Sequence, residues 1–186
     1  DYSGYEYISS FFSAISNKRV LNVNYKSFQG KEFNFDFHPY YLKQFNNRWF
    51  VFGLNESNGV SQWNIPLDRV VSFEELSNDY IEDETDWEEY FYDIIGVTRP
   101  AGVEPEEVIL KFSKEQAPYV ITKPLHPSQR QPEMQDDGNV IIRINVIPNF
   151  ELERMIISYG RGVEVLAPKT LRESLASTID EMKALY

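Results

Sequence analysis

The sequence has 186 residues, a length that fits one large domain or two small ones. It is 42% hydrophobic and 25% charged, as globular proteins are, and it contains 0 cysteines and 2 histidines. These counts exclude disulfides, thiol catalysis, cysteine zinc sites and a histidine-rich metal centre. The sequence contains no run of about 18 apolar residues, so it predicts no membrane span.

The net charge of −11 is concentrated in one part of the chain. Residues 1–76 carry −1, residues 77–107 carry −10 and residues 108–186 are neutral, counted from the printed sequence. The total argues against nucleic-acid binding, whereas the near-neutral flanking blocks leave room for a locally basic pocket.

One helix and then a series of short strands are predicted in the first 76 residues. Apolar residues at helical spacing predict a helix over residues 4–17. Strands are expected at residues 20–25, 32–40, 41–45, 48–54, 61–65 and 68–73, with turns at 29–30, 46–47 and 58–59. Pro39 is expected at the end or edge of a strand, because proline donates no ladder hydrogen bond. This series predicts a small β-barrel.

Residues 77–107 read as an acidic linker with one short helix around Trp87, Tyr90, Phe91 and Ile94, and a partner-binding acidic motif is the alternative. Residues 96–105 contain Pro100, Gly102 and Pro105 and mark the boundary of the next domain. The predicted domains are therefore residues 1–76 and 108–186, joined by the linker at 77–107.

The C-terminal block predicts the order strand, helix, strand, strand, helix, strand and a final helix. These elements fall at residues 108–112, 113–122, 129–134, 140–146, 150–158, 163–166 and from Pro168 onward. That order is typical of a ferredoxin-like fold, so the predicted class is α+β.

Known catalytic motifs are missing from the sequence. It has no nucleophile elbow, P-loop or dinucleotide-binding glycine motif, and no nucleophile is paired with a base. The run Ser158 to Gly162 reads as a helix stop rather than a phosphate loop. The sequence therefore predicts neither an enzyme nor a cofactor or metal site.

Four motifs in the first block, in this order, together resemble the WYL domain. They are residues 18–25 (KRVLNVNY), 38–42 (HPYYL), 47–53 (NRWFVFG) and 65–70 (IPLDRV). The C-terminal block resembles the WCX extension through residues 126–129 (HPSQ), 158–160 (SYG) and 163–168 (VEVLAP), followed by Leu171 and Arg172.

The resemblance implies an Sm-like, SH3-type small barrel that senses a ligand, with single-stranded DNA implicated for some members. It also implies an attached winged helix-turn-helix that binds operator DNA, and a WCX part that assists dimerisation. Because the sequence begins at Asp1, we expect that DNA-binding domain to lie outside it. The expected protein is a cytoplasmic homodimer with no membrane contact.

Single-stranded nucleic acid binds grooves that combine cations with aromatic stacking surfaces. The candidate ligand-binding residues are the aromatic residues Tyr25, Tyr40, Trp49 and Trp63 and the basic residues Lys26, His38, Arg48 and Arg69. Tyr25 and Trp49 are equally expected to fill the core, and Arg69 could pair with Asp68 or with linker acids instead.

The chain departs from the family pattern in two places. Phe50 and Val51 replace the tyrosine and leucine of the family name, and residues 62–64 lack the arginine that many members carry. Fewer cations predict weaker binding of a polyanion, so a nucleotide, another small molecule or a protein segment remains an alternative to single-stranded DNA. The competing function is a protein-interaction module without a small ligand.

Overall fold

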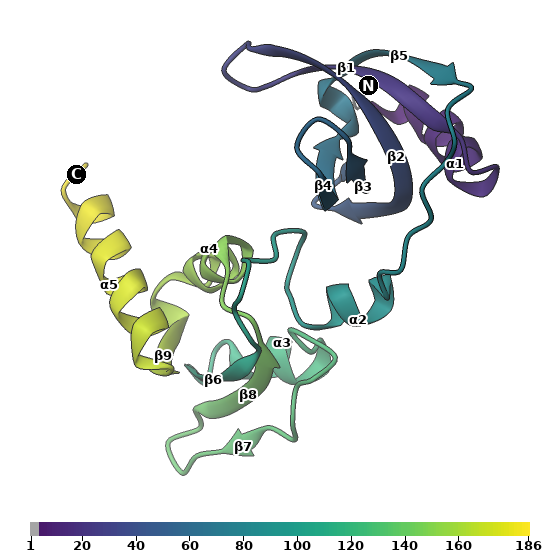
Figure 1. The fold of residues 1–186 in the computed structure, drawn as a ribbon. Coiled ribbons are helices and arrows are strands. Elements are labelled where there is room, and N and C mark those ends of the chain that lie inside the picture. Colours follow the sequence, from purple (N-terminus) through teal and green to yellow (C-terminus); the bar gives the residue numbers. More distant parts are fainter. Residues whose placement is uncertain (1–3) are drawn as a thin grey trace. The chain divides into compact units, whose positions relative to one another are not determined.

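The computed structural model describes residues 4–186, and the chain divides into two compact units, with the boundary between Thr85 and Asp86. Both units combine helices with an antiparallel sheet, as Figure 1 shows, so the predicted α+β class is confirmed. Within residues 4–186, no helix is long and apolar enough to cross a membrane.

The N-terminal unit begins with a 3-10 turn (Tyr5–Tyr7) and helix α1 (Ile8–Ser16), close to the helix expected from the sequence. Its strands are β1 (Val20–Lys26), β2 (Glu32–Phe45), β3 (Arg48–Asn55), β4 (Val60–Pro66) and β5 (Val70–Leu76), with a 3-10 turn η2 (Leu67–Arg69) before β5. They form a curved sheet in the order β4-β3-β2-β1-β5 (Figure 1). The pairings of the described residues leave this sheet open between β4 and β5, so strand pairing does not close the predicted barrel.

Strand β2 is continuous through Pro39, so Pro39 does not end a strand; the other expected position, an edge, is what the structure shows, because Pro39 pairs with β3 alone. Pairing with β1 reaches only to Phe37, and the β2–β3 register shifts between Pro39 and Tyr41. Pro39 thus lies where β2 has left β1 and its ladder with β3 is irregular, and such positions tolerate a residue that donates no hydrogen bond.

The core of this unit lies between α1 and the concave face of the sheet. The alternation seen in β2 places Phe35 and Phe37 in the core, while Asn34 and Asp36 bond Asn22 on the other face. The buried cluster consists of Phe11, Ala14, Leu21, Val23, Phe35, Phe37, Val51, Ile65, Leu67 and Val70.

The C-terminal unit contains a four-stranded antiparallel sheet in the order β7-β8-β6-β9. In chain order its elements are α2 (Trp87–Tyr92), β6 (Glu106–Phe112), α3 (Ala117–Thr122), β7 (Glu133–Met134), β8 (Val140–Val146), α4 (Phe150–Ser158), β9 (Val163–Ala167) and α5 (Lys169–Lys183). Alternate residues of β6 and β8, together with Leu152 of α4 and Leu171 and Leu175 of α5, fill its core.

Residues 93–98, inside the acidic segment, are bonded to the C-terminal unit. The backbone N–H of Ile147 donates to the Asp93 carbonyl at 2.7 Å, and the Asn149 side chain donates to the carbonyls of Ile95 and Thr98, each at 2.8 Å. Helix α2 falls in the same unit, which begins at Asp86.

We predict that Gly53→Ala destabilises the N-terminal unit. A methyl group at this position would meet the His38 carbonyl oxygen and the Phe37 ring, and overpacking of this kind costs about 1–3 kcal/mol. Urea unfolding followed by tryptophan fluorescence measures the change. Ser61→Ala on β4 serves as the control and should stay within about 0.5 kcal/mol of wild type. An unchanged unfolding midpoint for Gly53→Ala would contradict the close approach of β2 and β3.

Candidate functional site

Two arginines, one carboxylate and two aromatic rings form a cluster in the N-terminal unit. Arg48 opens β3 and Arg69 closes η2, and their Nε atoms lie 3.2 Å and 3.7 Å from the two carboxylate oxygens of Asp68. The Phe28 ring, in the turn between β1 and β2, has the Arg48 and Arg69 guanidinium carbons 5.2 Å and 4.5 Å from its centroid. We call Tyr25, Phe28, Arg48, Asp68 and Arg69 the paired-arginine cluster.

The paired-arginine cluster carries an excess of positive charge, because two guanidinium groups share one carboxylate. Burial raises the pKa of the Tyr25 hydroxyl above its ordinary value, while the charges of Arg69 and Arg48 oppose this and that of Asp68 adds to it. The Tyr25 hydroxyl is therefore uncharged at neutral pH and can donate a hydrogen bond. Together these groups suit a ligand that carries negative charge.

Two polar atoms in this cluster are buried without a hydrogen bond among the described residues. They are Asp68 Oδ1 and Arg69 Nε; the contact between Arg48 Nε and Asp68 Oδ1 has ion-pair distance but not hydrogen-bond geometry. An unsatisfied buried polar atom costs free energy, so the arrangement of Asp68 and Arg69 is held at a cost in stability.

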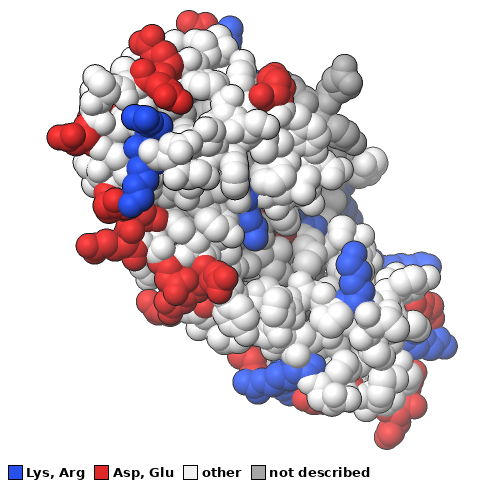
Figure 2. All heavy atoms as spheres, turned by 90° about the vertical axis from the view of Figure 1, so that its right-hand side faces the viewer, with Lys and Arg blue, Asp and Glu red and all other residues white. Residues whose placement is uncertain are grey.

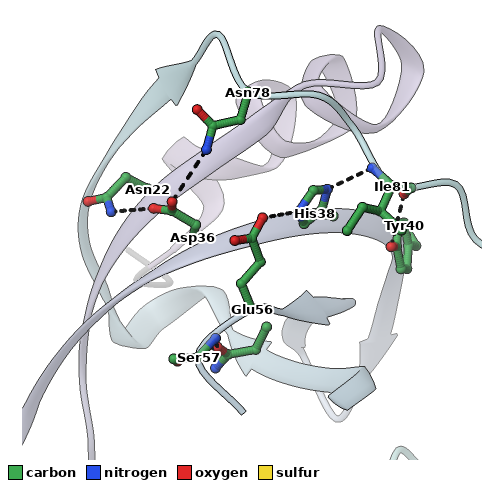
Figure 3. A network of polar contacts seen from close by, with 9 residues as sticks. Asn22, Asp36, His38, Tyr40, Glu56, Ser57, Asn78 and Ile81 are labelled. Carbon is green, nitrogen blue, oxygen red and sulfur yellow. Dashed lines mark hydrogen bonds and ion pairs between the residues drawn. The ribbon is translucent and has the colours of Figure 1, made fainter. Parts of the chain in front are cut away.

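His38 and Tyr40 form a second group, drawn in Figure 3. The His38 ring is fully buried on β2, with Nε2 2.6 Å from Glu56 Oε1 and Nδ1 3.0 Å from the backbone nitrogen of Ile81. The Tyr40 hydroxyl donates to the Ile81 carbonyl at 3.0 Å, and the Tyr80 hydroxyl donates to the Pro39 carbonyl at 2.7 Å. Residues 78–85, which we call the strap, are thus fastened across β2.

These contacts determine which nitrogen of His38 carries the proton. The Ile81 N–H can only donate, so Nδ1 accepts and the ring proton lies on Nε2, facing the Glu56 carboxylate. In this conformation His38 offers no nitrogen to a ligand. Burial, with smaller contributions from Asp83 and Glu82, raises the pKa of Tyr40 to about 12, so its bond to the strap persists at neutral pH.

The other predicted residues make their contacts outside the paired-arginine cluster. Trp49 and Tyr40 line an apolar groove of about 520 Å³, together with Ile8, Ser9, Phe12, Ile15, Tyr41 and Leu42. Lys26 pairs with Glu32 at 3.5 Å, and Trp63 is exposed on β4 opposite Gly53. Within residues 4–186, no hydrogen bond, ion pair or ring contact joins Lys26 or Trp63 to the cluster.

The structure brings together Tyr25, Arg48 and Arg69 of the predicted set, and it adds Phe28, which sequence reasoning missed. In the sequence, a single aromatic residue in a turn gives no indication that it will contact two arginines far away in the chain. The pairing of Arg69 with Asp68 is one of the alternatives that the sequence left open. Tyr25 and Trp49 are partly buried and pack against the core, as the other alternative expected.

On one face of the molecule, charge is local rather than extended. On the face drawn in Figure 2, Asp and Glu gather in groups while most Lys and Arg stand separately. A broad basic stripe, which duplex DNA binding requires, is therefore not visible on that face. The paired-arginine cluster fits a small anionic group better than a long duplex.

Two family models match the chain, the WYL domain over residues 6–74 and the WCX domain over residues 104–183. The chain therefore contains a WYL domain followed by a WCX domain, as the sequence motifs predicted. A comparison with curated protein sequences found no significant match.

Solved structures resemble the chain at low sequence identity. A CRISPR Cas-related protein matches with a TM-score of 0.55 and 12% identity, over 98% of this chain and 52% of that one. Proteasome accessory factor B/C (PafBC) of Arthrobacter aurescens matches with a TM-score of 0.40 and 19% identity, over 98% of this chain and 27% of that one. The chain thus spans about half and about a quarter of these two proteins.

We predict that His38→Gln loosens the strap. Loss of the Nδ1 acceptor removes one hydrogen bond with a net value of about 1 kcal/mol, which corresponds to about fivefold faster exchange of the Ile81 amide. Hydrogen exchange of peptides covering residues 78–85 measures this effect, and the milder Tyr80→Phe should act in the same direction.

His126→Gln is the matched control for this measurement, because His126 is also buried but bonds Ser128 in the C-terminal unit. It should leave exchange of the strap unchanged. Equal exchange of Ile81 in wild type and in His38→Gln would show that His38 does not hold the strap.

Proposed function

We propose that the chain is the ligand-sensing region of a DNA-binding transcription regulator. The WYL and WCX domains support a regulatory role, and the effector we propose is a single-stranded nucleic acid or a nucleotide bound by the N-terminal unit. Operator DNA would be read by a winged helix-turn-helix domain outside this sequence. No catalytic role is proposed for this chain.

The paired-arginine cluster is the observation that carries this proposal. Guanidinium groups that stack on an aromatic ring present their N–H edges outward, in the geometry that suits phosphate oxygens. Arg48 and Arg69 both lie over Phe28 and share Asp68, so both guanidinium groups are held in place before a ligand arrives. In a chain with a net charge of −11, this is a local site for an anion.

Strand order supports the finer fold that the resemblance implies. In the N-terminal unit the order β4-β3-β2-β1-β5, with η2 between β4 and β5, fits an Sm-like, SH3-type barrel. In the C-terminal unit the order β7-β8-β6-β9, with α3 and α4 as crossovers, fits a ferredoxin-like domain. We propose these folds, a cytoplasmic location, and a homodimer that uses the C-terminal unit.

We predict saturable binding of fluorescein-labelled dT12 that depends on Arg48 and Arg69. Two phosphate contacts should make the affinity fall about sevenfold between 50 and 200 mM salt, and Arg48→Ala/Arg69→Ala should weaken binding by about tenfold or more. Fluorescence anisotropy at the two salt concentrations measures both effects.

The control is Arg130→Ala/Arg172→Ala, which removes the same charge from ion pairs in the C-terminal unit. It should bind dT12 as wild type does. Equal weakening of dT12 binding by the two double variants would show that only the net charge of the chain matters, which would contradict a site at Arg48 and Arg69. If folded protein does not bind dT12 even at low salt, the proposal is also contradicted.

The second candidate function is a protein-interaction module, which the apolar groove favours. Its lining includes Phe12, which is well exposed on α1, and a partner polypeptide would cover such a surface. This candidate gains if labelled nucleic acid does not bind while Phe12→Ser abolishes a contact with a partner protein.

A further inference from the structure

We propose that Phe28 stacks one nucleobase, so that the paired-arginine cluster is a subsite for a single nucleotide. The inference rests on the proposed function and deepens it, because it separates recognition of the base from recognition of the phosphate. It concerns a residue for which the sequence motifs predicted no role.

The first step is that Phe28 lies in a turn and is exposed to solvent. Its side chain is 60% exposed, although it lies in a turn of ordered backbone. The Ser27 N–H donates to the Lys31 carbonyl at 2.8 Å, the Gly30 N–H donates to the Ser27 carbonyl at 2.9 Å, and the Lys31 N–H donates to Ser27 Oγ at 3.1 Å. The ring is therefore presented to solvent from a fixed backbone.

The two arginines supply the second step, because both of their guanidinium groups lie against the Phe28 ring. Their guanidinium carbons lie 5.2 Å and 4.5 Å from the ring centroid, and both groups are also tied to Asp68. Much of the ring surface stays open to solvent, and an exposed aromatic surface of fixed orientation is what base stacking needs.

Charge and stacking then converge on one kind of ligand. The guanidinium edges beside the ring suit a phosphate, the Tyr25 hydroxyl can donate to it, and the open ring surface suits the base of the same nucleotide. A ligand with phosphates but no bases would use only half of this subsite. The bases should therefore contribute to affinity through Phe28, and the phosphates through Arg48 and Arg69.

Two labelled strands of equal length and charge separate these contributions. The first is dT12, and the second has the same sugar–phosphate backbone with every base removed. Wild type should bind dT12 about fivefold to tenfold more tightly than the abasic strand, as one stacked base predicts. Phe28→Leu should lose that preference and bind both strands with the abasic affinity, while Phe28→Trp should keep it.

Phe150→Leu is the matched control, since Phe150 in the C-terminal unit is 62% exposed and has the Arg154 guanidinium carbon 5.1 Å from its ring centroid. It should bind both strands as wild type does. A preference for dT12 that survives in Phe28→Leu, or equal binding of the two strands by wild type, would overturn the inference while the proposed function stands. Binding of neither strand by wild type would overturn both.

Discussion

The register between β3 and β4 is the constraint on which the candidate site depends. Phe50 pairs with Pro66, so Arg48, two residues before Phe50, and Asp68, two residues after Pro66, arrive at the same end of the hairpin. The 3-10 turn that follows Pro66 then places Arg69 beside the same carboxylate. Because a shift of one residue would move every side chain to the opposite face, the geometry of the arginine pair follows from this register.

The site and the strap use the two parts of the long strand β2. Its first part pairs with β1, whose neighbouring turn carries Phe28. Its second part carries His38 and Tyr40, which both bond the backbone of Ile81. The polar contacts of the strap involve backbone groups of Pro39 and Ile81, so they depend on the path of the chain as well as on side-chain identity. The segment that leads out of the N-terminal unit is thereby attached to the sheet that carries the candidate site.

Local patterns in the sequence predicted much of this fold. Helical spacing at Phe11 and alternation at Phe35 and Phe37 report burial of one face, and that burial is what the structure shows. Interactions between residues that are distant in the sequence were harder to predict. Pro39 was expected at the end or edge of a strand, and the sequence could not decide between them, because it does not show that β2 continues after pairing with β1 stops.

The same limit applies to the candidate site. Arg48, Arg69 and Tyr25 were expected as ligand contacts from a resemblance and from their chemistry, whereas Phe28 joins them only through the folded turn. His38 had the right chemistry for a phosphate contact, but its two nitrogens are bonded to Glu56 and Ile81, and the sequence carries no signal for either bond. Residue type indicates which contacts a side chain can make, whereas the long-range fold determines which partner it contacts.

The most direct measurement is a ¹H–¹⁵N NMR titration of the whole chain with unlabelled dT12 that follows the arginine Nε–H signals and the backbone amides. The account predicts saturable shifts at the Nε–H groups of Arg48 and Arg69 and at the amides of Tyr25 and Phe28. Shifts confined to residues of the apolar groove, such as Ile8 and Trp49, or no shifts at all, would contradict a nucleotide site at the arginine pair.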